Sequence, residues 1–477
     1  MLFSYKTGAV FLLSLVLASC VTTDEEQRPE IEYADSYQTG DAYKDAAQNA
    51  TQVATQIDTN WWQAFNSPIL NELMLAADQQ SPDVLIVAER VRQAELQMQI
   101  ANATLFPSLN ASASSGERRS ENNTAGSTSA NLSINYEVDL WGGIAAGRKS
   151  AEAGFDATRF DQAAALLSIK AAIASGWFQW LSLQERIVSA QKNIVIAERV
   201  QKVVDARYRN GAATAAEVSQ QKTNLLTQQA TLLPLELQAR QTRTALAILL
   251  GKTPQEFTLA TAHLVDVAVP EIAPGTPADL VTRRPDLAAS EANLIAANAD
   301  IVQARAALLP GISLSGNASK SASELFSLNP ATQVSGWTVS LAQSLFNGGR
   351  LVNQKHLSEA RREELLLQYH KAILVALQEV DTALASADIS VRQEASLKAI
   401  LVQAEISVRL TEVRYREGSD DILSLLVAQR SLFVAQDSLV QQRLARLNAA
   451  VDLYKALGGG WQLTDQDSNT ISVSSLN

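Results

Sequence analysis

The sequence predicts a mainly α-helical fold with a membrane β-barrel, organised as an internal two-fold repeat. Three observations predict it: the two halves of the chain align with each other, each half holds a very long stretch of helical periodicity, and short segments between the helices alternate polar with apolar residues. The chain has 477 residues and a formal net charge of −11. This acidic balance disfavours nucleic acid as a partner.

The repeat covers most of the chain. The segment that begins at Pro82 aligns with the one that begins at Pro285, and RYRNGAAT from Arg207 aligns with RYREGSDD from Arg414. Residues 207–251 and 414–458 align without gaps, with 11 of 45 positions identical. Each half therefore predicts the same order: a helix, a pair of strands, a long helix, a glycine turn and a returning helix.

Two long helices are predicted, over 144–208 and 351–416, with shorter ones over 82–106, 212–250, 285–309 and 420–457. In both long helices, residues at alternating spacings of three and four form a coiled-coil seam. The seam residues are Ile187, Ala190, Ile194, Ala197, Gln201, Val204 and Tyr208, and then Leu397, Leu401, Ala404, Val408, Thr411 and Tyr415. The alternative is an ordinary bundle helix, but a rod about 100 Å long argues against it. We expect the two short helices of each half to stack end to end beside the long one.

The strand signals lie between the helices. NLSINYEVDLW places Leu132, Ile134 and Tyr136 on one face and polar residues on the other, and GWTVSLAQSLF repeats the pattern more weakly. PSLNASASS and PGISLSGNAS also alternate. Such segments are typical of a transmembrane β-barrel, although a half-buried strand of a soluble sheet is the alternative. Residues 117–130 and 320–334 are expected to be exposed loops at the hairpin tips.

Four strands are too few to close a barrel, because closure needs at least about eight. An open sheet edge in lipid would leave backbone groups without hydrogen-bond partners. The chain is therefore expected to oligomerise, with eight strands as a dimer or twelve as a trimer. The strand count does not choose between them, but a wall of twelve long helices leaves a wide lumen, whereas eight would leave little.

The first residues resemble an export signal. Lys6 precedes AVFLLSLVLAS, an apolar run too short to span a bilayer, and the run ends in LASC, which resembles the bacterial lipobox. This predicts cleavage after residue 19 and a covalent lipid on Cys20; an ordinary secretory signal is the alternative. Cys20 is the only cysteine, so no disulfide is expected. Val21 rather than Asp after the cysteine favours the outer membrane. No later segment is predicted to be a membrane-spanning helix, so a crossing would use strands.

Six segments carry a resemblance to a known family. They are DTNWWQAFNSPILNELMLAA (58–77), TRRPDLAASEANLIAANADIVQARAALLPGISLSG (282–316), YEVDLWGG, SLFNGGR, YREGSDDILSLLVAQRSL and YKALGGGW. Together they resemble the outer membrane factor (TolC-like) family, and within it the efflux outer membrane lipoprotein channels of the OprM/NodT type. One position departs from the family pattern: Ser67 stands where an Asp before Pro68 is usual.

The resemblance implies a homotrimer with a twelve-stranded barrel in the outer membrane and a twelve-helix tunnel that projects into the periplasm. It implies a lipid-anchored exit duct of a tripartite efflux system, which passes small molecules or drugs from an inner-membrane pump and a periplasmic adaptor to the outside. A type I protein secretion channel shares this architecture. The lipobox and YKALGGGW favour small-molecule efflux. A non-channel coiled-coil periplasmic lipoprotein is disfavoured by the alternating strands.

The domain organisation follows from the repeat and the resemblance. It comprises a signal peptide (1–19), an N-terminal anchor, linker and equatorial segment (20–81), a first repeat (82–251, strand pair 107–141), a central equatorial linker (252–284), a second repeat (285–458, strand pair 310–346) and a C-terminal equatorial tail (459–477).

No catalytic constellation is predicted. The three histidines, His263, His356 and His370, and the single cysteine form no triad and no metal-ligand cluster. We therefore expect no enzyme activity, no metal and no cofactor besides the lipid on Cys20. The GGG at 458–460 follows a helix rather than opening one, so it is interpreted as a helix stop and not as a phosphate loop.

The two glycine turns are the candidate functional site. Gly211 and Gly418 permit the positive φ that ends a helix tightly, and the length of the helices puts both turns far from the membrane. Small residues beside them leave room for an adaptor hairpin, so the predicted docking residues are Gly211, Ala212, Gly418 and Ser419.

The predicted periplasmic gate comprises Asp420, Asp421, Tyr415, Arg416, Tyr208 and Arg209. Three copies of Asp420 would form an acidic ring that constricts the axis and favours cations. The alternative for either Asp is to cap the returning helix. The Tyr and Arg side chains would tie neighbouring hairpins together. The first repeat has Ala213 and Thr214 where the second has the two Asp residues.

Overall fold

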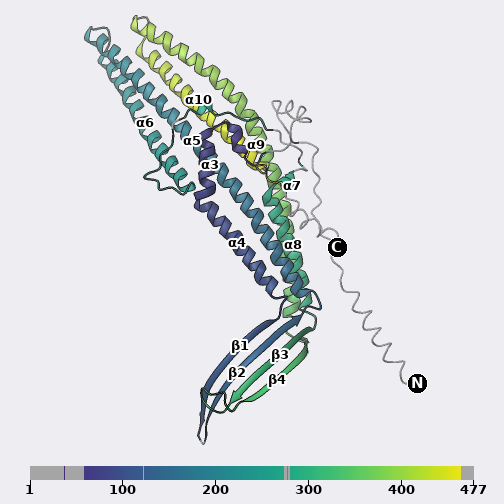
Figure 1. Cartoon of the computed structure of the whole chain (residues 1–477). Coiled ribbons are helices and arrows are strands. Elements are labelled where there is room, and N and C mark those ends of the chain that lie inside the picture. Colours follow the sequence, from purple (N-terminus) through teal and green to yellow (C-terminus); the bar gives the residue numbers. More distant parts are fainter. Residues whose placement is uncertain are drawn as a thin grey trace.

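A computed structural model describes residue 37 and residues 58–462, apart from 122, 261, 273–276, 278 and 279. The predicted signal peptide, the lipidation site Cys20 and most of the C-terminal tail lie outside the described residues. The chain forms a bundle of long helices with a four-stranded sheet at one end (Figure 1). None of the described helices is both long and apolar enough to cross a membrane.

Two helices, α5 (Gly143–Arg209) and α9 (Arg350–Arg416), run the length of the bundle with 67 residues each. At 1.5 Å per residue each is about 100 Å long, as expected. Helices α4 (Pro82–Ala103) and α6 (Ala215–Leu249) pack on α5, and α8 (Pro285–Ala306) and α10 (Ile422–Ala456) pack on α9. The two halves are joined because α5 also packs on α8 and α10.

The coiled-coil stripe of the long helices is buried as predicted, with a small shift in α5. Ala190, Ala197 and Val204 of the predicted seam are buried, and the buried stripe also includes Asn193 and Val200 in place of Ile194 and Gln201. In α9 the buried seam residues are Ala404, Val408 and Tyr415. The returning helices α6 and α10 begin three and two residues later than predicted. The reason is that Thr214 and Asp421 have extended backbones and act as the N-caps of α6 and α10.

The short helices meet end to end beside the long ones. Gly251 follows α6 with a φ of +66°, and a Cβ there would collide with the carbonyl oxygen of Gln80, just before α4. Gly458 follows α10 with a φ of +86°, and a Cβ there would collide with the carbonyl oxygen of Arg283, just before α8. Only glycine fits such a close approach of two backbones. The expected stacking is confirmed.

The sheet is antiparallel in the order β1-β2-β3-β4, formed by Ser108–Ser120, Asn123–Val138, Gly311–Ala322 and Thr332–Ala342. Because side chains alternate along each strand, Leu132 and Ile134 share one face with Leu109, Leu314 and Trp337. We call this the apolar face of the sheet. Its large side chains are exposed, Trp337 by 77%.

The prediction of a loop over residues 117–130 is wrong, because β1 and β2 extend through almost all of this segment. Cross-strand hydroxyl hydrogen bonds of 2.9 Å join Ser114 to Ser129 and Ser115 to Thr128. These polar pairs continue the sheet where the apolar alternation has ended. The second expected loop is shorter than predicted, over 323–331.

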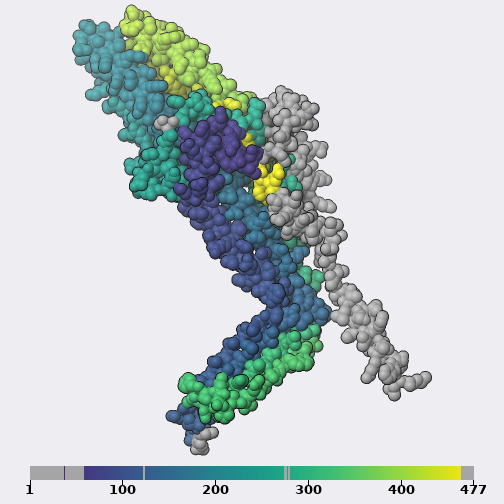
Figure 2. Space-filling model, viewed as in Figure 1, coloured from purple at the N-terminus to yellow at the C-terminus, as the bar shows by residue number. Residues whose placement is uncertain are grey.

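The largest hydrophobic core of the described residues lies at the middle of the long helices. There η1 (Trp61–Phe65) and α3 (Pro68–Gln80) pack with α5 and the end of α10, and Figure 2 shows this segment in dark purple on the side of the bundle. Trp61 stacks on Tyr454 at 5.2 Å between ring centroids, and Phe65 lies 5.0 Å from Phe178. The central linker, with η2 (Leu264–Asp266) and α7 (Leu280–Arg283), joins this layer. Arg443 donates to the carbonyl oxygen of Val267 at 2.6 Å, which fastens the linker to α10.

Candidate functional site at the paired helix turns

The α5–α6 and α9–α10 turns lie together at the end of the bundle remote from the sheet (Figure 1). Gly211 has a φ of +70° and Gly418 a φ of +80°, as the turn prediction required. The amide of Ala212 donates to the carbonyl oxygen of Arg207 at 2.8 Å, and that of Ser419 to the carbonyl oxygen of Arg414 at 2.9 Å. Both turns are thus Schellman motifs, which satisfy the last carbonyl groups of the long helices.

Arg207 of the first turn reaches across to the second. Its guanidinium lies over the ring of Tyr415, 4.7 Å from the centroid, and donates to the backbone carbonyl of the same residue. A second nitrogen donates to the carbonyl oxygen of Ala212 at 3.2 Å. One planar cation therefore joins the end of α5 to the end of α9 through a cation–π contact and charge-assisted hydrogen bonds.

Tyr415 is only 2% exposed, and its hydroxyl donates to Glu217 Oε2 at 3.3 Å. The other oxygen of Glu217 accepts from the backbone amide of Thr214 at 3.2 Å, in a capping box that begins α6. Burial, and secondarily the Glu217 carboxylate, raises the pKa of Tyr415 to about 12. The tyrosine is therefore neutral and a hydrogen-bond donor at any physiological pH. We call Arg207, Tyr415 and Glu217 the tip clamp.

Apolar packing supports the tip clamp from within the bundle. Val200 and Val204 of α5 form a buried cluster with Tyr415 of α9 and with Ile422 and Leu425 of α10. This cluster and the clamp use side chains from both hairpins. Opening the tip would therefore have to separate a packed apolar surface as well as hydrogen bonds.

The two aspartates of the second turn have different partners. Asp421 Oδ1 accepts from the amide of Ser424 at 2.7 Å and caps α10, and this backbone hydrogen bond lowers the pKa of Asp421. The capping alternative thus describes Asp421 in this structure. Asp420 accepts from the amide of Asp421 at 3.0 Å and lies 3.6 Å from Arg414 Nε. Its second contact is a loose, partly solvated ion pair.

The remaining predicted gate residues stay outside the clamp. Tyr208 is 49% exposed, Arg209 donates to the carbonyl oxygen of Asp205 in its own helix at 3.3 Å, and Arg416 lies 3.7 Å from its neighbour Glu417. Sequence reasoning missed Arg207 and Glu217. The first belongs to the repeated Arg-Tyr-Arg motif, and the second follows Thr214 at the spacing of a capping box, so both signals were present.

Within the part of the chain that the structure describes, no group of three His, Cys, Asp or Glu residues is placed to hold a metal ion. The tip clamp joins two helical hairpins through a buried tyrosine hydroxyl, a carboxylate and a guanidinium.

Paired hairpins of about 100 Å, attached to a sheet with an exposed apolar face and joined to each other at the far end, define the class of elongated outer membrane channels. The chain belongs to the outer membrane efflux protein family, whose model matches residues 73–252 and 276–459. It is an efflux protein of the bacterial outer membrane. The family is one of channels and not of enzymes.

Three similar proteins illustrate the range of the family. The pyoverdine export outer membrane protein OpmQ of Pseudomonas putida is 39% identical over 421 residues, 85% of this chain and 89% of that protein. The antibiotic efflux pump outer membrane protein ArpC of Pseudomonas putida is 30% identical over 474 residues, 96% of this chain and 97% of that protein. The CmeC outer membrane channel of Campylobacter jejuni shares the fold, with a TM-score of 0.85, 20% identity and coverage of 95% of this chain and 98% of that one.

Proposed function

We propose that this chain forms the trimeric exit duct of a tripartite efflux system. Three four-stranded sheets would close a twelve-stranded barrel in the outer membrane, and three sets of hairpins would form a twelve-helix tunnel in the periplasm. The open edges support this proposal, because β1 and β4 end the sheet and lipid offers their backbone groups no hydrogen-bond partner. The inner-membrane pump and a periplasmic adaptor would supply cargo at the tip, and the lipid on Cys20 would add an anchor.

The tip clamp is the observation that carries the gating part of the proposal. In each protomer it holds the second hairpin against the first, and three closed protomers would narrow the tunnel at its periplasmic end. Three copies of Asp420 would line the constriction and favour cations over anions. Tyr208, Arg209, Arg416 and Asp421 would lie around it, where Tyr208 and the two arginines are available for contacts between protomers.

The adaptor would dock on the two turns. Gly211, Ala212, Gly418 and Ser419 carry small side chains, and a helical hairpin can approach such a surface closely. All four residues lie three to five positions from Arg207 or Tyr415. Docking there would therefore act on the turns that the clamp joins, and it would release the second hairpin.

Single-channel conductance in planar bilayers tests the gate. Tyr415→Phe removes the hydroxyl that bonds Glu217 and retains the ring under Arg207, so we expect a conductance several-fold higher than that of the unaltered trimer. Tyr136→Phe is the control, because its hydroxyl lies on β2 at the opposite end of the molecule from the clamp. Equal conductance of the Tyr415→Phe and unaltered trimers would refute the gating role.

A siderophore is a second candidate cargo beside drugs. The observation that favours it is sequence similarity, since the pyoverdine export protein is 39% identical and the antibiotic efflux protein 30% identical. Deleting the gene should lower the secreted siderophore while drug susceptibility stays unchanged. Increased drug susceptibility with normal siderophore secretion would favour drug cargo, and loss of a secreted protein would favour the type I secretion alternative.

A further inference from the structure

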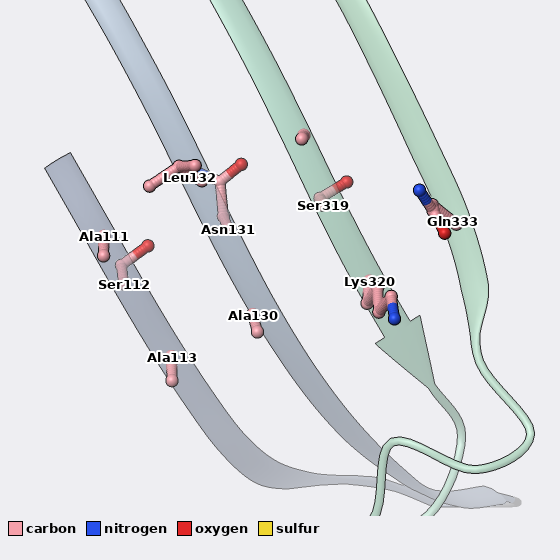
Figure 3. A pocket seen from close by; sticks show the side chains of 10 residues that line it. Ala111, Ser112, Ala113, Ala130, Asn131, Leu132, Ser319, Lys320 and Gln333 are labelled. Carbon is pink, nitrogen blue, oxygen red and sulfur yellow. The ribbon is translucent and has the colours of Figure 1, made fainter. Parts of the chain in front are cut away.

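The apolar face of the sheet contains a shallow hollow of about 530 Å³. Its floor consists of short side chains from neighbouring strands, Ala111, Ala113, Ala130 and Ala318, which the strand register places on the same face as Leu132. Figure 3 shows Leu132 on β2, with Lys320 and Gln333 on the two strands beyond it. All four strands belong to one protomer, so the hollow does not depend on a seam between protomers.

Lys320 places a positive charge on the same face. It is exposed, and no described carboxylate forms an ion pair with it. Lys320 lies nine residues beyond the start of β3 at Gly311, which is about 30 Å along a strand and roughly 23 Å of height at a typical barrel tilt. An apolar band of an outer membrane barrel is about 25 Å tall. With the start of β3 at one boundary of the band, a closed barrel would place the ammonium group at the other boundary, at the level of lipid headgroups.

The β3–β4 loop folds over this face instead of extending away from it. Thr128 on β2 donates to the carbonyl oxygen of Glu324 at 2.6 Å, and Ser115 on β1 accepts from the amide of Phe326 at 3.0 Å. By register, Thr128 and Ser115 continue the series of Ala130 and Ala113 on the apolar face.

Phe326 is held in a strained and exposed position by these contacts. Its φ is +56°, unusual for a bulky residue, and its side chain is 88% exposed. The Phe326 amide is bonded to Ser115, two positions along β1 from Ala113 of the hollow, and an exposed aromatic residue on a loop anchored there, together with Lys320, is typical of a ligand surface. The combination matches a ligand with acyl chains and a phosphate group.

We propose that the hollow, Lys320 and Phe326 bind the lipid A part of lipopolysaccharide from the outer leaflet. Lys320 would pair with a lipid A phosphate, and acyl chains would lie over the alanine floor and against Phe326. This inference rests on the proposed barrel, which turns the apolar face toward lipid and the strand tips outward. A lipid-facing lysine is costly unless it reaches the headgroup level, where an anionic phosphate stabilises it.

Native mass spectrometry of the full-length trimer tests the proposal with three probes: bisphosphorylated lipid A, dephosphorylated lipid A and phosphatidylglycerol. Lys320→Gln should lower the affinity for bisphosphorylated lipid A about fivefold, the effect of one basic residue near an anionic lipid surface. Lys320→Arg should retain binding, and Phe326→Ser should weaken binding of all acylated probes. Lys222→Gln, which changes an exposed lysine of α6, is the matched control.

Two results would overturn the lipid site: equal lipid A affinity of Lys320→Gln and the unaltered trimer, or equal affinity of that trimer for all three probes. The second result would mean a general lipid surface without phosphate recognition. Measuring the conductance of the same preparations distinguishes failure of the lipid-site proposal from failure of the proposed duct. A conducting trimer without selective lipid A binding refutes only the lipid site, whereas a chain that forms no conducting trimer refutes the duct.

Discussion

At the residue scale, Tyr415 connects the two hairpins more closely than any other predicted gate residue. It lies under Arg207, bonds Glu217 and packs on Val200 and Val204. The repeated Arg-Tyr-Arg motif drew attention to the turns, but its two copies have different roles. The first contributes its arginine to the tip clamp, and the second contributes its tyrosine.

The clamp should weaken at alkaline pH. The folded-state pKa of Tyr415 is about 12, against about 10 for an ordinary tyrosine. Because the folded state favours the neutral hydroxyl, its contribution is fully present below pH 10 and is lost as the pH rises toward 12. Amide hydrogen exchange at the turns, corrected for intrinsic rate, should accelerate over this range. The Tyr415→Phe variant should show no such acceleration of exchange between pH 10 and 12. An acceleration of equal size in that variant would contradict the assignment of this pH dependence to the Tyr415 hydroxyl.

Asp420 should affect conductance through its charge. Asp420→Asn removes the ion pair with Arg414 and the predicted acidic ring, so we expect higher single-channel conductance and weaker cation selectivity. The stability cost should be below about 1 kcal/mol, because the ion pair is solvated. Glu236→Gln, which removes an exposed carboxylate of α6 far from the turns, is the control. An unchanged conductance for Asp420→Asn, with the trimer intact, would remove Asp420 from the gate.

At the element scale, the bundle depends on glycines at the junctions between short helices. Gly251 and Gly458 occupy equivalent places in the two halves, and each allows the end of one helix to approach the backbone that precedes another. This close approach lets two short helices, placed end to end, cover one long helix. The hydrophobic core lies beside these junctions, where η1, α3 and the central linker pack.

Gly458→Ala should destabilise the chain by about 2 kcal/mol or more, because alanine is strained at positive φ and its Cβ would meet the backbone of Arg283. Gly154→Ala within α5 is the control. No neighbouring atom lies within 4 Å of a Cβ at Gly154, so helix propensity should make that change neutral or stabilising by up to about 1 kcal/mol. Thermal unfolding of the purified protein measures both; similar midpoints would contradict the packing argument.

At the scale of the whole molecule, the sheet and the helices place different chemistry at opposite ends. The apolar face of the sheet suits lipid, and its other face carries Ser133, Asn135 and Ser315 by register. The remote end carries the tip clamp. About 100 Å of helix separates the two ends.

The two faces of the sheet should respond differently to charge. Ile134→Lys puts an ammonium group on the apolar face opposite Gly316, at the middle of β3, which should cost roughly 2–4 kcal/mol in a lipid-exposed barrel. Ser133→Lys changes the neighbouring residue on the polar face and should be tolerated. The fraction of heat-resistant trimer extracted from outer membranes measures the difference. Equal tolerance of both variants would contradict a lipid-facing position for Ile134.

The repeating order of elements, the length of the helices and the two faces of the strands could be predicted from the residues alone, because each is encoded by local periodicity and by turn residues such as Gly211 and Gly418. Which side chains meet depends on how the elements pack in three dimensions. Arg207 contacts a residue 208 positions away, Glu217 reaches Tyr415, and the amide of Phe326 in the β3–β4 loop donates to Ser115 of β1. Such contacts depend on the relative register of whole helices and hairpins, and no local pattern in either partner specifies that register.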